Sequence, residues 1–168
     1  RQAGYPEHIT TLIAMLCTES PRQLVKQGNV TYYVALADRC LPQGAPTSPA
    51  LTNVICLTLD RRLTGLADQH GLRYSRYADD LTFSLPADTV LEKDAKNQLI
   101  STLLGSVAKI LREEGFAINS KKTRIIHQGG VQQVTGLVVN GDAVPRVPRK
   151  LKRMLRAAIH NLEQGKPL

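Results

Sequence analysis

Residues 74–84 read Tyr-Ser-Arg-Tyr-Ala-Asp-Asp-Leu-Thr-Phe-Ser and place two adjacent carboxylates, Asp79 and Asp80, between two strand-like arms. Aromatic, β-branched and hydroxyl side chains in the arms favour extended backbone, and aspartate tolerates the tight bend of a short hairpin. Neighbouring negative charges repel each other, but water screens them at an exposed turn and a divalent cation would make the pair favourable. Asp-Asp at a turn is by itself most often a solvated bend. The choice between a bend and a metal site therefore depends on the rest of the chain.

The composition describes a globular protein with a basic balance. The chain has 168 residues, of which 42% are hydrophobic and 21% charged, so its length predicts one domain with a real core. The net charge of +8 comes from 22 basic and 14 acidic residues and favours a polyanion, nucleic acid first, although solubility alone could explain it.

No apolar stretch of the sequence is long enough to span a membrane, and no signal-peptide pattern opens it. We therefore expect a cytoplasmic protein without a membrane partner. The sequence begins with Arg1 rather than Met, directly on a helix-like pattern, so we also expect a piece of a longer polypeptide.

The residue types that often hold metals are scattered. The cysteines form no Cys-x-x-Cys pair and argue against a disulfide framework and a zinc site: Cys17, Cys40 and Cys56. The histidines show no ligand spacing: His8, His70, His127 and His160. We interpret the cysteines as small buried apolar residues and the histidines as ordinary core or surface residues.

Periodicity and turn signals predict a mixed chain. Helices are expected over 6–18, 48–67 and 90–114 and again from Pro148, with Ser48 as an N-cap and Gly71 and Gly115 as stop signals. Residues 19–29 are expected to form a polar loop. Strands are expected at 30–36, 74–84 (as a hairpin), 116–118, 123–127, 132–134 and 136–140.

This order is best accommodated by an α+β fold, an antiparallel sheet with helices packed on one face. Val144–Pro148, with two prolines, is the one plausible internal boundary. The sequence thus predicts a main part over 1–145, followed over 146–168 by a connector and a basic helix.

Four segments in order resemble one known family. Tyr-Ala-Asp-Asp at 77–80, after Leu-Pro-Gln-Gly-Ala-Pro-Thr-Ser-Pro at 41–49, resembles the palm of a reverse transcriptase. Gly-Phe-Ala-Ile-Asn-Ser-Lys-Lys-Thr at 115–123 and Val-Thr-Gly-Leu-Val-Val-Asn at 134–140 are similar to the bacterial retron type. The resemblance implies a palm-like fold, incomplete here, with residues 146–168 as the connector and the first helix of the thumb.

The resemblance also implies a metal site at the two carboxylates. Nucleotidyl transfer uses two divalent ions about 3.5–4 Å apart. Asp79 would be the bridging ligand and Asp80 a weaker, partly indirect one, with Mg²⁺ as the expected ion and Mn²⁺ as an alternative.

Further site residues follow from the same resemblance. Gln43 and Gly44 match the segment that contacts the nucleotide, where glycine lets the backbone approach a ligand. Lys122, or Lys121 if the register shifts by one, would neutralise or protonate the leaving pyrophosphate. Residues 131–140 resemble the segment that grips the primer end.

The helix after Pro148 resembles the start of the thumb, where basic side chains meet phosphates without reading sequence. Its expected nucleic-acid contacts are Arg149, Lys150, Lys152, Arg153 and Arg156. A charged helix face is also commonly just a solvated face.

The chain departs from the family pattern at one catalytic position. A palm uses a third carboxylate upstream of the Pro-Gln-Gly segment, and Asp38, the one aspartate before Pro42, lies too close to that proline to match. Two carboxylates cannot hold both ions unaided, so we expect these 168 residues to be inactive alone while the full protein copies RNA into DNA. Sheet edges left open by the missing strand could also promote self-association.

The leading hypothesis is a retron-like RNA-directed DNA polymerase, with an RNA template, a DNA primer or product, deoxynucleoside triphosphates and a structured non-coding RNA as partners. One alternative is another bacterial reverse transcriptase, intron-encoded or associated with antiviral defence. A second alternative is a non-catalytic RNA-binding module. The 4% aromatic content argues for backbone binding over base stacking in such a module.

Overall fold

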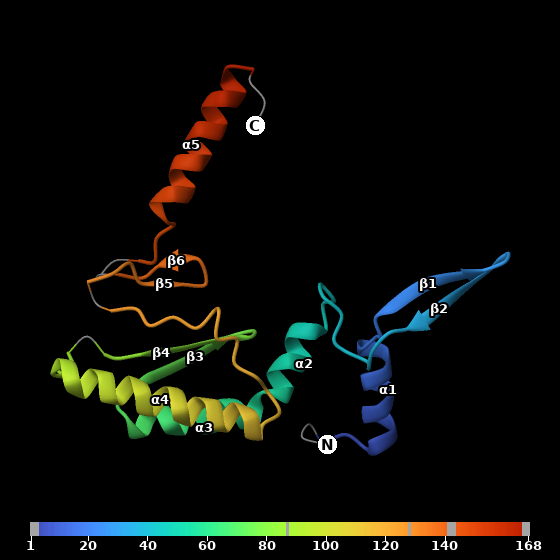
Figure 1. Ribbon diagram of the computed structural model, residues 1–168, viewed down its shortest axis with the longest axis horizontal. Coiled ribbons are helices and arrows are strands. Elements are labelled where there is room, and N and C mark those ends of the chain that lie inside the picture. The colour runs from blue at the N-terminus through green and yellow to red at the C-terminus, as the bar shows by residue number, and fades with distance from the viewer. Residues whose placement is uncertain (1–3, 87, 128, 141–143, 166–168) are drawn as a thin grey trace. The chain divides into compact units, whose positions relative to one another are not determined.

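The computed structural model describes residues 4–86, 88–127, 129–140 and 144–165. The chain divides into two compact units, residues 1–65 and 66–168. Helices and small antiparallel hairpins build them (Figure 1), which confirms the mixed α+β character predicted from the sequence. The predicted domain boundary at 145/146 stays a prediction.

The first unit contains a helix, a hairpin, a second helix and most of a third: α1 (Glu7–Cys17), β1 (Arg22–Gln27), β2 (Val30–Ala35), α2 (Ser48–Ile55) and α3 (Leu57–Gln69). The second unit contains the end of α3 and then β3 (Arg73–Tyr77), β4 (Asp80–Ser84), α4 (Lys93–Glu113), β5 (Gln133–Val134), β6 (Leu137–Val138) and α5 (Arg149–Glu163). The helices expected over 6–18, over 90–114 and after Pro148 are therefore confirmed, with ends shifted by up to three residues.

The hairpin β1–β2 occupies most of the segment expected to be a polar loop over 19–29, so that prediction is wrong. Gln27 pairs with Val30, which leaves the two-residue loop Gly28–Asn29 between the strands. Gly28 has a φ of +62°, and glycine at the first position of a two-residue loop is typical of a type II′ turn. Every residue of both strands is exposed, and a strand with two exposed faces lacks the alternation that identifies strands in a sequence.

Arg39 joins the segment after this hairpin to the end of α1. Its Nη2 atom donates to the carbonyl oxygen of Met15 at 2.6 Å and to that of Thr18, and its Nε atom donates to Thr18 Oγ1 at 3.0 Å. A cation at a helix C-terminus satisfies carbonyl groups that have no partner within the helix. The backbone amides of Glu19 and Cys40 each donate to the other's carbonyl, at 3.0 and 2.9 Å, and close the base of the hairpin.

The proline-rich run at 41–49 forms a turn that leads into α2. The Ala45 amide donates to the Pro42 carbonyl at 3.4 Å, and Gly44 has a φ of +83°. Thr47, not Ser48, occupies the N-cap position, so the predicted cap is wrong. Ser48 Oγ donates to the Pro42 carbonyl at 2.8 Å instead, which secures the turn rather than the helix end.

The long helix predicted over 48–67 is two helices separated at Cys56. Gly71, with a φ of +64°, follows α3, and the amide of Leu72 donates to the carbonyl of Ala67 at 2.8 Å. This bond across five residues is the Schellman arrangement that glycine permits at a helix end. The stop predicted at Gly71 is confirmed.

The same arrangement ends α4. Gly115 has a φ of +80°, and the amide of Phe116 donates to the carbonyl of Leu111 at 2.7 Å. The predicted stop at Gly115 is confirmed as well.

The strands expected at 116–118 and 123–127 are absent from the described residues. Asn119 explains the local departure, because its Oδ1 atom accepts the Lys121 amide at 3.2 Å and its carbonyl accepts the Thr123 amide and hydroxyl at 3.1 and 3.0 Å. Such local hydrogen bonds compete with a strand ladder.

The strands of the described residues form three separate two-stranded antiparallel sheets, β1–β2, β3–β4 and β5–β6 (Figure 1). The expectation of one antiparallel sheet is therefore wrong for the described residues. Each of these strands pairs only with the other strand of its own hairpin, and β5 and β6 are only two residues long.

Few side chains are fully enclosed. The buried apolar residues of the first unit are Cys56, Leu59 and Leu63, and those of the second unit are Ala67, Leu72, Val107 and Leu111. The expectation of buried cysteines is confirmed for Cys56 and wrong for Cys40, which is exposed, and for Cys17, which is half-buried. Across the described ranges, no helix is both long enough and apolar enough to cross a bilayer.

Candidate active site

The two adjacent carboxylates lie at the turn of the β3–β4 hairpin, as the sequence predicted. Tyr77 pairs with Asp80, so the loop between the strands consists of Ala78 and Asp79 alone. Lower in the ladder, Tyr74 pairs with Phe83, and their rings lie 5.1 Å apart between centroids at an interplanar angle of 41°. Cross-strand aromatic pairs stabilise a hairpin, so both carboxylates stand on a rigid support.

The loop holds its first residue in an uncommon conformation. Ala78 has a φ of +53°, where a side chain costs roughly 1–2 kcal/mol and glycine is usual. Arg76, on β3, donates from its Nη1 atom to the Ala78 carbonyl at 3.0 Å and so fixes the loop to the strand before it. Backbone strain of this kind persists where the surroundings impose it, and it concentrates at functional sites.

The β5–β6 hairpin has a second short loop, Thr135–Gly136, between the paired residues Val134 and Leu137. Thr135 and Gly136 have φ values of +47° and +85°, and two positive φ values are typical of a type I′ turn. Thr135 is β-branched, which makes its φ a genuine outlier.

Asn140 fixes the base of this second hairpin. Its Oδ1 atom accepts the Gln132 amide at 2.5 Å, and its Nδ2 atom donates to the Gly130 carbonyl at 2.7 Å. Arg146 Nη2 donates to the Asn140 carbonyl at 3.1 Å, and Arg146 also pairs with Val138 through backbone hydrogen bonds of 2.7 and 2.9 Å. The short strands therefore owe their position to side-chain hydrogen bonds as well as to their ladder.

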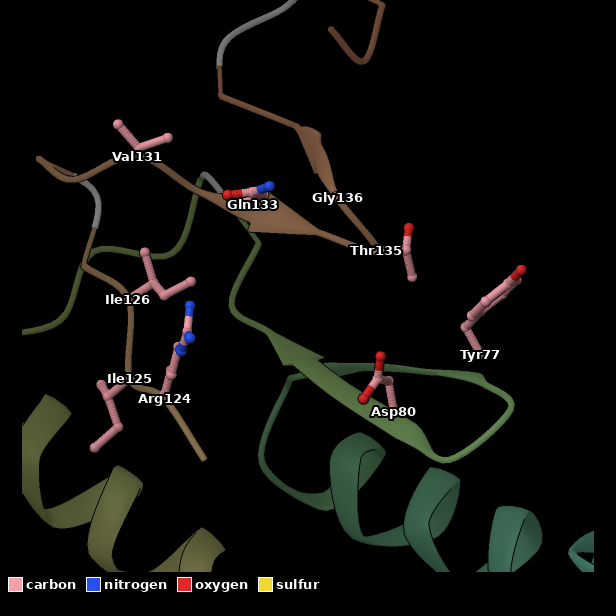
Figure 2. A pocket seen from close by; sticks show the side chains of 9 residues that line it. All are labelled: Tyr77, Asp80, Arg124, Ile125, Ile126, Val131, Gln133, Thr135 and Gly136. Carbon is pink, nitrogen blue, oxygen red and sulfur yellow. The ribbon is translucent and has the colours of Figure 1, made fainter. Parts of the chain in front are cut away.

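Both hairpins of the second unit border an open pocket of about 810 Å³. Its lining residues are Tyr77, Asp80, Arg124, Ile125, Ile126, Val131, Gln133, Thr135 and Gly136 (Figure 2). Figure 2 shows the Asp80 carboxylate directed from β4 into this space and the Arg124 side chain extending into it from the segment before β5. The volume lies within the range of small-molecule sites. A carboxylate and a guanidinium in one pocket suit a ligand that carries both metal ions and phosphates.

The predicted site residues of the second unit differ in whether they line the pocket. Both carboxylates are exposed; Asp80 lines the pocket, whereas Asp79, in the loop beside it, is not among the lining residues. Lys121 and Lys122 are exposed in the turn that starts at Asn119 and are not among the residues that line the pocket. Within the described ranges, no group of three or more histidine, cysteine, aspartate or glutamate side chains is arranged to hold a metal ion.

The predicted nucleotide contacts belong to the first unit. Gln43 and Gly44 form the exposed tip of the turn before α2. A Cβ atom added to Gly44 would meet nothing within 4 Å, so space for a ligand exists over this backbone.

The predicted phosphate contacts are all exposed on α5: Arg149, Lys150, Lys152, Arg153 and Arg156. Apolar side chains on the same helix are also exposed, at 43–60% of their surface: Leu151, Met154, Leu155, Ile159 and Leu162. The amphipathic character predicted for this helix is therefore present.

The site predicted from the sequence did not include Arg124. Arg124 follows directly after the Lys-Lys-Thr segment, where a third basic residue could have been noticed. Gln133 lies within the predicted segment 131–140, but a glutamine in a short strand carries no individual signal. Thr135 was noticed only within the segment that resembles the primer-gripping region.

Comparison with known proteins identifies the class. The family model described as "Reverse transcriptase (RNA-dependent DNA polymerase)" matches residues 4–154. The chain therefore belongs to the reverse transcriptase family.

Three similar proteins are reverse transcriptases of retrons. The chain is 46% identical to the Retron Mx162 reverse transcriptase of Myxococcus xanthus, over 99% of this chain and 36% of that protein. It is 43% identical to the Retron Mx65 reverse transcriptase of the same species, over 94% of this chain and 34% of that protein. It is 44% identical to the Retron Ec86 reverse transcriptase of Escherichia coli, over 75% of this chain and 36% of that protein. The resemblance inferred from the motifs is confirmed, and the chain spans about a third of the length of these relatives.

Proposed function

We propose that the protein containing this chain copies RNA into DNA, and that the β3–β4 hairpin carries metal-binding carboxylates of its active site. The observation that carries the proposal is the position of Asp80, which opens β4 and projects into the same pocket as Arg124. Family membership supplies the reaction class, and the pocket supplies a place for its charged substrate.

The carboxylate pair fits a divalent cation in chemical type. Carboxylate oxygens are the ligands that Mg²⁺ prefers, and Mn²⁺ accepts the same donors. Two such ions would lower the pKa of the attacking hydroxyl and neutralise charge on the triphosphate. Asp79 and Asp80 provide part of the donor set, and a third carboxylate outside the motifs of this chain completes it by family resemblance.

Other residues of the chain would bind and orient the substrates. Gly44 would let the backbone approach the incoming nucleotide, and the Gln43 amide would donate to it or accept from it. Lys122 would neutralise or protonate the leaving pyrophosphate.

The partners follow from the same proposal. An RNA template, a DNA primer or product and deoxynucleoside triphosphates are the substrates, and the basic side of α5 would contact backbone phosphates. The names of the relatives favour a retron-type enzyme. By the family resemblance, such an enzyme would work on its own structured RNA in the bacterial cytoplasm, and antiviral defence is the context that we expect for it.

Primer extension by the full-length protein tests this proposal. The protein would be given an RNA template, a DNA primer and Mg²⁺, beside Asp79→Asn and Asp80→Asn variants. Each substitution should reduce synthesis by at least about 10²-fold, because it removes charge that stabilises the transition state. Asp88→Asn, which changes an exposed carboxylate in the loop after β4, is the matched control and should retain full synthesis.

Two outcomes would contradict the proposal. Unchanged synthesis in the Asp79→Asn and Asp80→Asn variants would remove the metal assignment. RNA binding without synthesis in every protein tested would favour the non-catalytic RNA-binding module instead.

A further inference from the structure

The β1–β2 hairpin has two chemically different faces. Residues paired across an antiparallel ladder lie on one face, and successive residues alternate between faces. The first face, called the Tyr33 face below, consists of Arg22, Leu24, Lys26, Thr31, Tyr33 and Ala35. The second, called the Tyr32 face, consists of Gln23, Val25, Gln27, Val30, Tyr32 and Val34. Both charged residues of the hairpin therefore lie on the Tyr33 face, and the Tyr32 face is uncharged.

Charge and exposure favour a polyanion on the Tyr33 face. Residues 20–37 contain no aspartate or glutamate, so no acidic side chain within this segment offsets Arg22 and Lys26. Tyr33 is 69% exposed, whereas its neighbour Tyr32 on the opposite face is 49% exposed.

The spacing on this face suits a nucleic-acid strand. Arg22 and Lys26 are four residues apart on β1, a span of roughly 13 Å along a strand. Leu24, the partner of Tyr33, lies midway between them. The tyrosine ring is therefore flanked on both sides by a cation, the combination by which proteins stack a base and hold the adjacent phosphates.

The hairpin is also held in place before any ligand arrives. The Leu36 amide donates to the Pro21 carbonyl at 2.8 Å at the base of the ladder, next to the Glu19–Cys40 pair. Arg39 then ties the following segment to the last turn of α1. A preorganised platform loses less conformational entropy on binding.

We propose that the Tyr33 face binds single-stranded RNA, with one base stacked on Tyr33 and backbone phosphates held by Arg22 and Lys26. The choice of RNA over DNA rests on the proposed function, in which unpaired RNA is the template. Tyr33 is the one aromatic side chain on this face, so one base stacks there, and because every base has a π-face the binding is insensitive to sequence. The Tyr32 face, which is uncharged and carries three valines, suits protein packing instead.

The adjacent tyrosines provide a matched pair of variants. Full-length protein would be titrated with a fluorescent oligouridylate of about 12 nucleotides, within the size range of single-strand sites. Tyr33→Ala should weaken binding by about 5- to 150-fold, the loss expected for one stacked base. Tyr32→Ala changes the same residue type on the same strand but on the opposite face, and it should leave the affinity unchanged. Tyr33→Phe keeps the ring and should bind as the unmodified protein does.

The salt dependence tests the two cations. Arg22→Gln and Lys26→Gln should each reduce the slope of log affinity against log salt by about 0.7, the value for one phosphate contact on a single strand. Lys109→Gln, on the exposed surface of α4, is the charge-matched control and should leave the slope unchanged.

Photocrosslinking locates the contact without a substitution in the hairpin. An oligoribonucleotide containing 5-iodouracil should crosslink to Tyr33 and not to Tyr32. The proposal fails if both alanine variants lose affinity equally, if neither does, or if the crosslink forms at Tyr32 or is absent from the hairpin. Preference for the DNA version of the same oligonucleotide would overturn the choice of RNA.

The same assay separates this proposal from the proposed function. The Asp79→Asn protein should lose synthesis yet retain both RNA affinity and the Tyr33 crosslink. If the unmodified protein made no DNA but still crosslinked through Tyr33, the RNA surface would stand and the polymerase assignment would fall.

Discussion

Ala78 and Thr135 occupy the same position in two different hairpins: each is the first residue of a two-residue loop, with φ values of +53° and +47°. Among the described residues, no other non-glycine residue has a positive φ. Ala78 directly precedes the two carboxylates, and Thr135 lines the pocket that receives Asp80. Strain is thus concentrated around the candidate active site, where pre-organisation is its usual role.

Relief of this strain should stabilise the protein. Ala78→Gly should raise the free energy of unfolding by up to about 1 kcal/mol, because the cost of positive φ exceeds the extra backbone entropy that glycine loses on folding. Thermal or urea unfolding of the full-length protein would measure the change. Ala157→Gly, at an exposed position inside α5, should instead destabilise by about 0.5–1 kcal/mol. Equal destabilisation by both substitutions would show that Ala78 is not strained.

The guanidinium of Arg39 should stabilise α1 through its geometry rather than its charge alone. Arg39→Lys keeps the charge but loses the fork that reaches Met15 and Thr18 together, so α1 should lose about 1 kcal/mol of local stability. Hydrogen exchange of the α1 amides would measure this as faster exchange. Arg61→Lys, on the exposed side of α3, should leave α1 exchange unchanged. If the α1 amides exchange at the same rate in Arg39→Lys, the positive charge alone, and not the geometry of the guanidinium, stabilises α1.

The two lysines of the Asn119 turn should differ in their effect on catalysis. If Lys122 protonates the leaving pyrophosphate, Lys122→Ala should lower kcat by about 10²-fold or more with little change in KM. Lys121→Ala should leave both parameters near their original values. Steady-state incorporation of a single nucleotide by the full-length protein distinguishes them, and the reverse pattern would move the role to Lys121.

The basic side of α5 should contribute affinity without sequence preference. The double substitution Arg153→Gln and Arg156→Gln should reduce the salt slope of binding to a primer–template duplex by about 2, since each phosphate contact on a duplex contributes about 0.9. The loss should be equal for templates of different sequence. An unchanged slope would mean that this charged face is simply solvated.

Local chemistry explains what the sequence could predict. The bend at Asp79 and the glycine stops at Gly71 and Gly115 each depend on a few consecutive residues, and the structure confirms all three. The motifs also sufficed to identify the family, because their order and spacing are specific.

The misses arose where local signals are weak or compete. β1 has two exposed faces and hence no alternation to detect. Between two segments expected to be strands, Asn119 holds residues 119–123 in a turn through its own hydrogen bonds. Arg124 joins the candidate active site only because β4 and the segment before β5 border one pocket, a relationship between residues distant in the chain.

The two-residue loop Gly28–Asn29 restricts the changes in length that the β1–β2 hairpin can accept during evolution without separating the residues of one face. One residue inserted into a single strand would shift the pairing and move every following side chain to the opposite face. The cations and Tyr33 would then no longer share a surface. One residue added to each strand at the loop end, by contrast, lengthens the hairpin and leaves the original pairs and their faces unchanged. Homologous hairpins should therefore vary in length by matched pairs of residues, and a survey of their lengths would reveal selection for the two-faced surface.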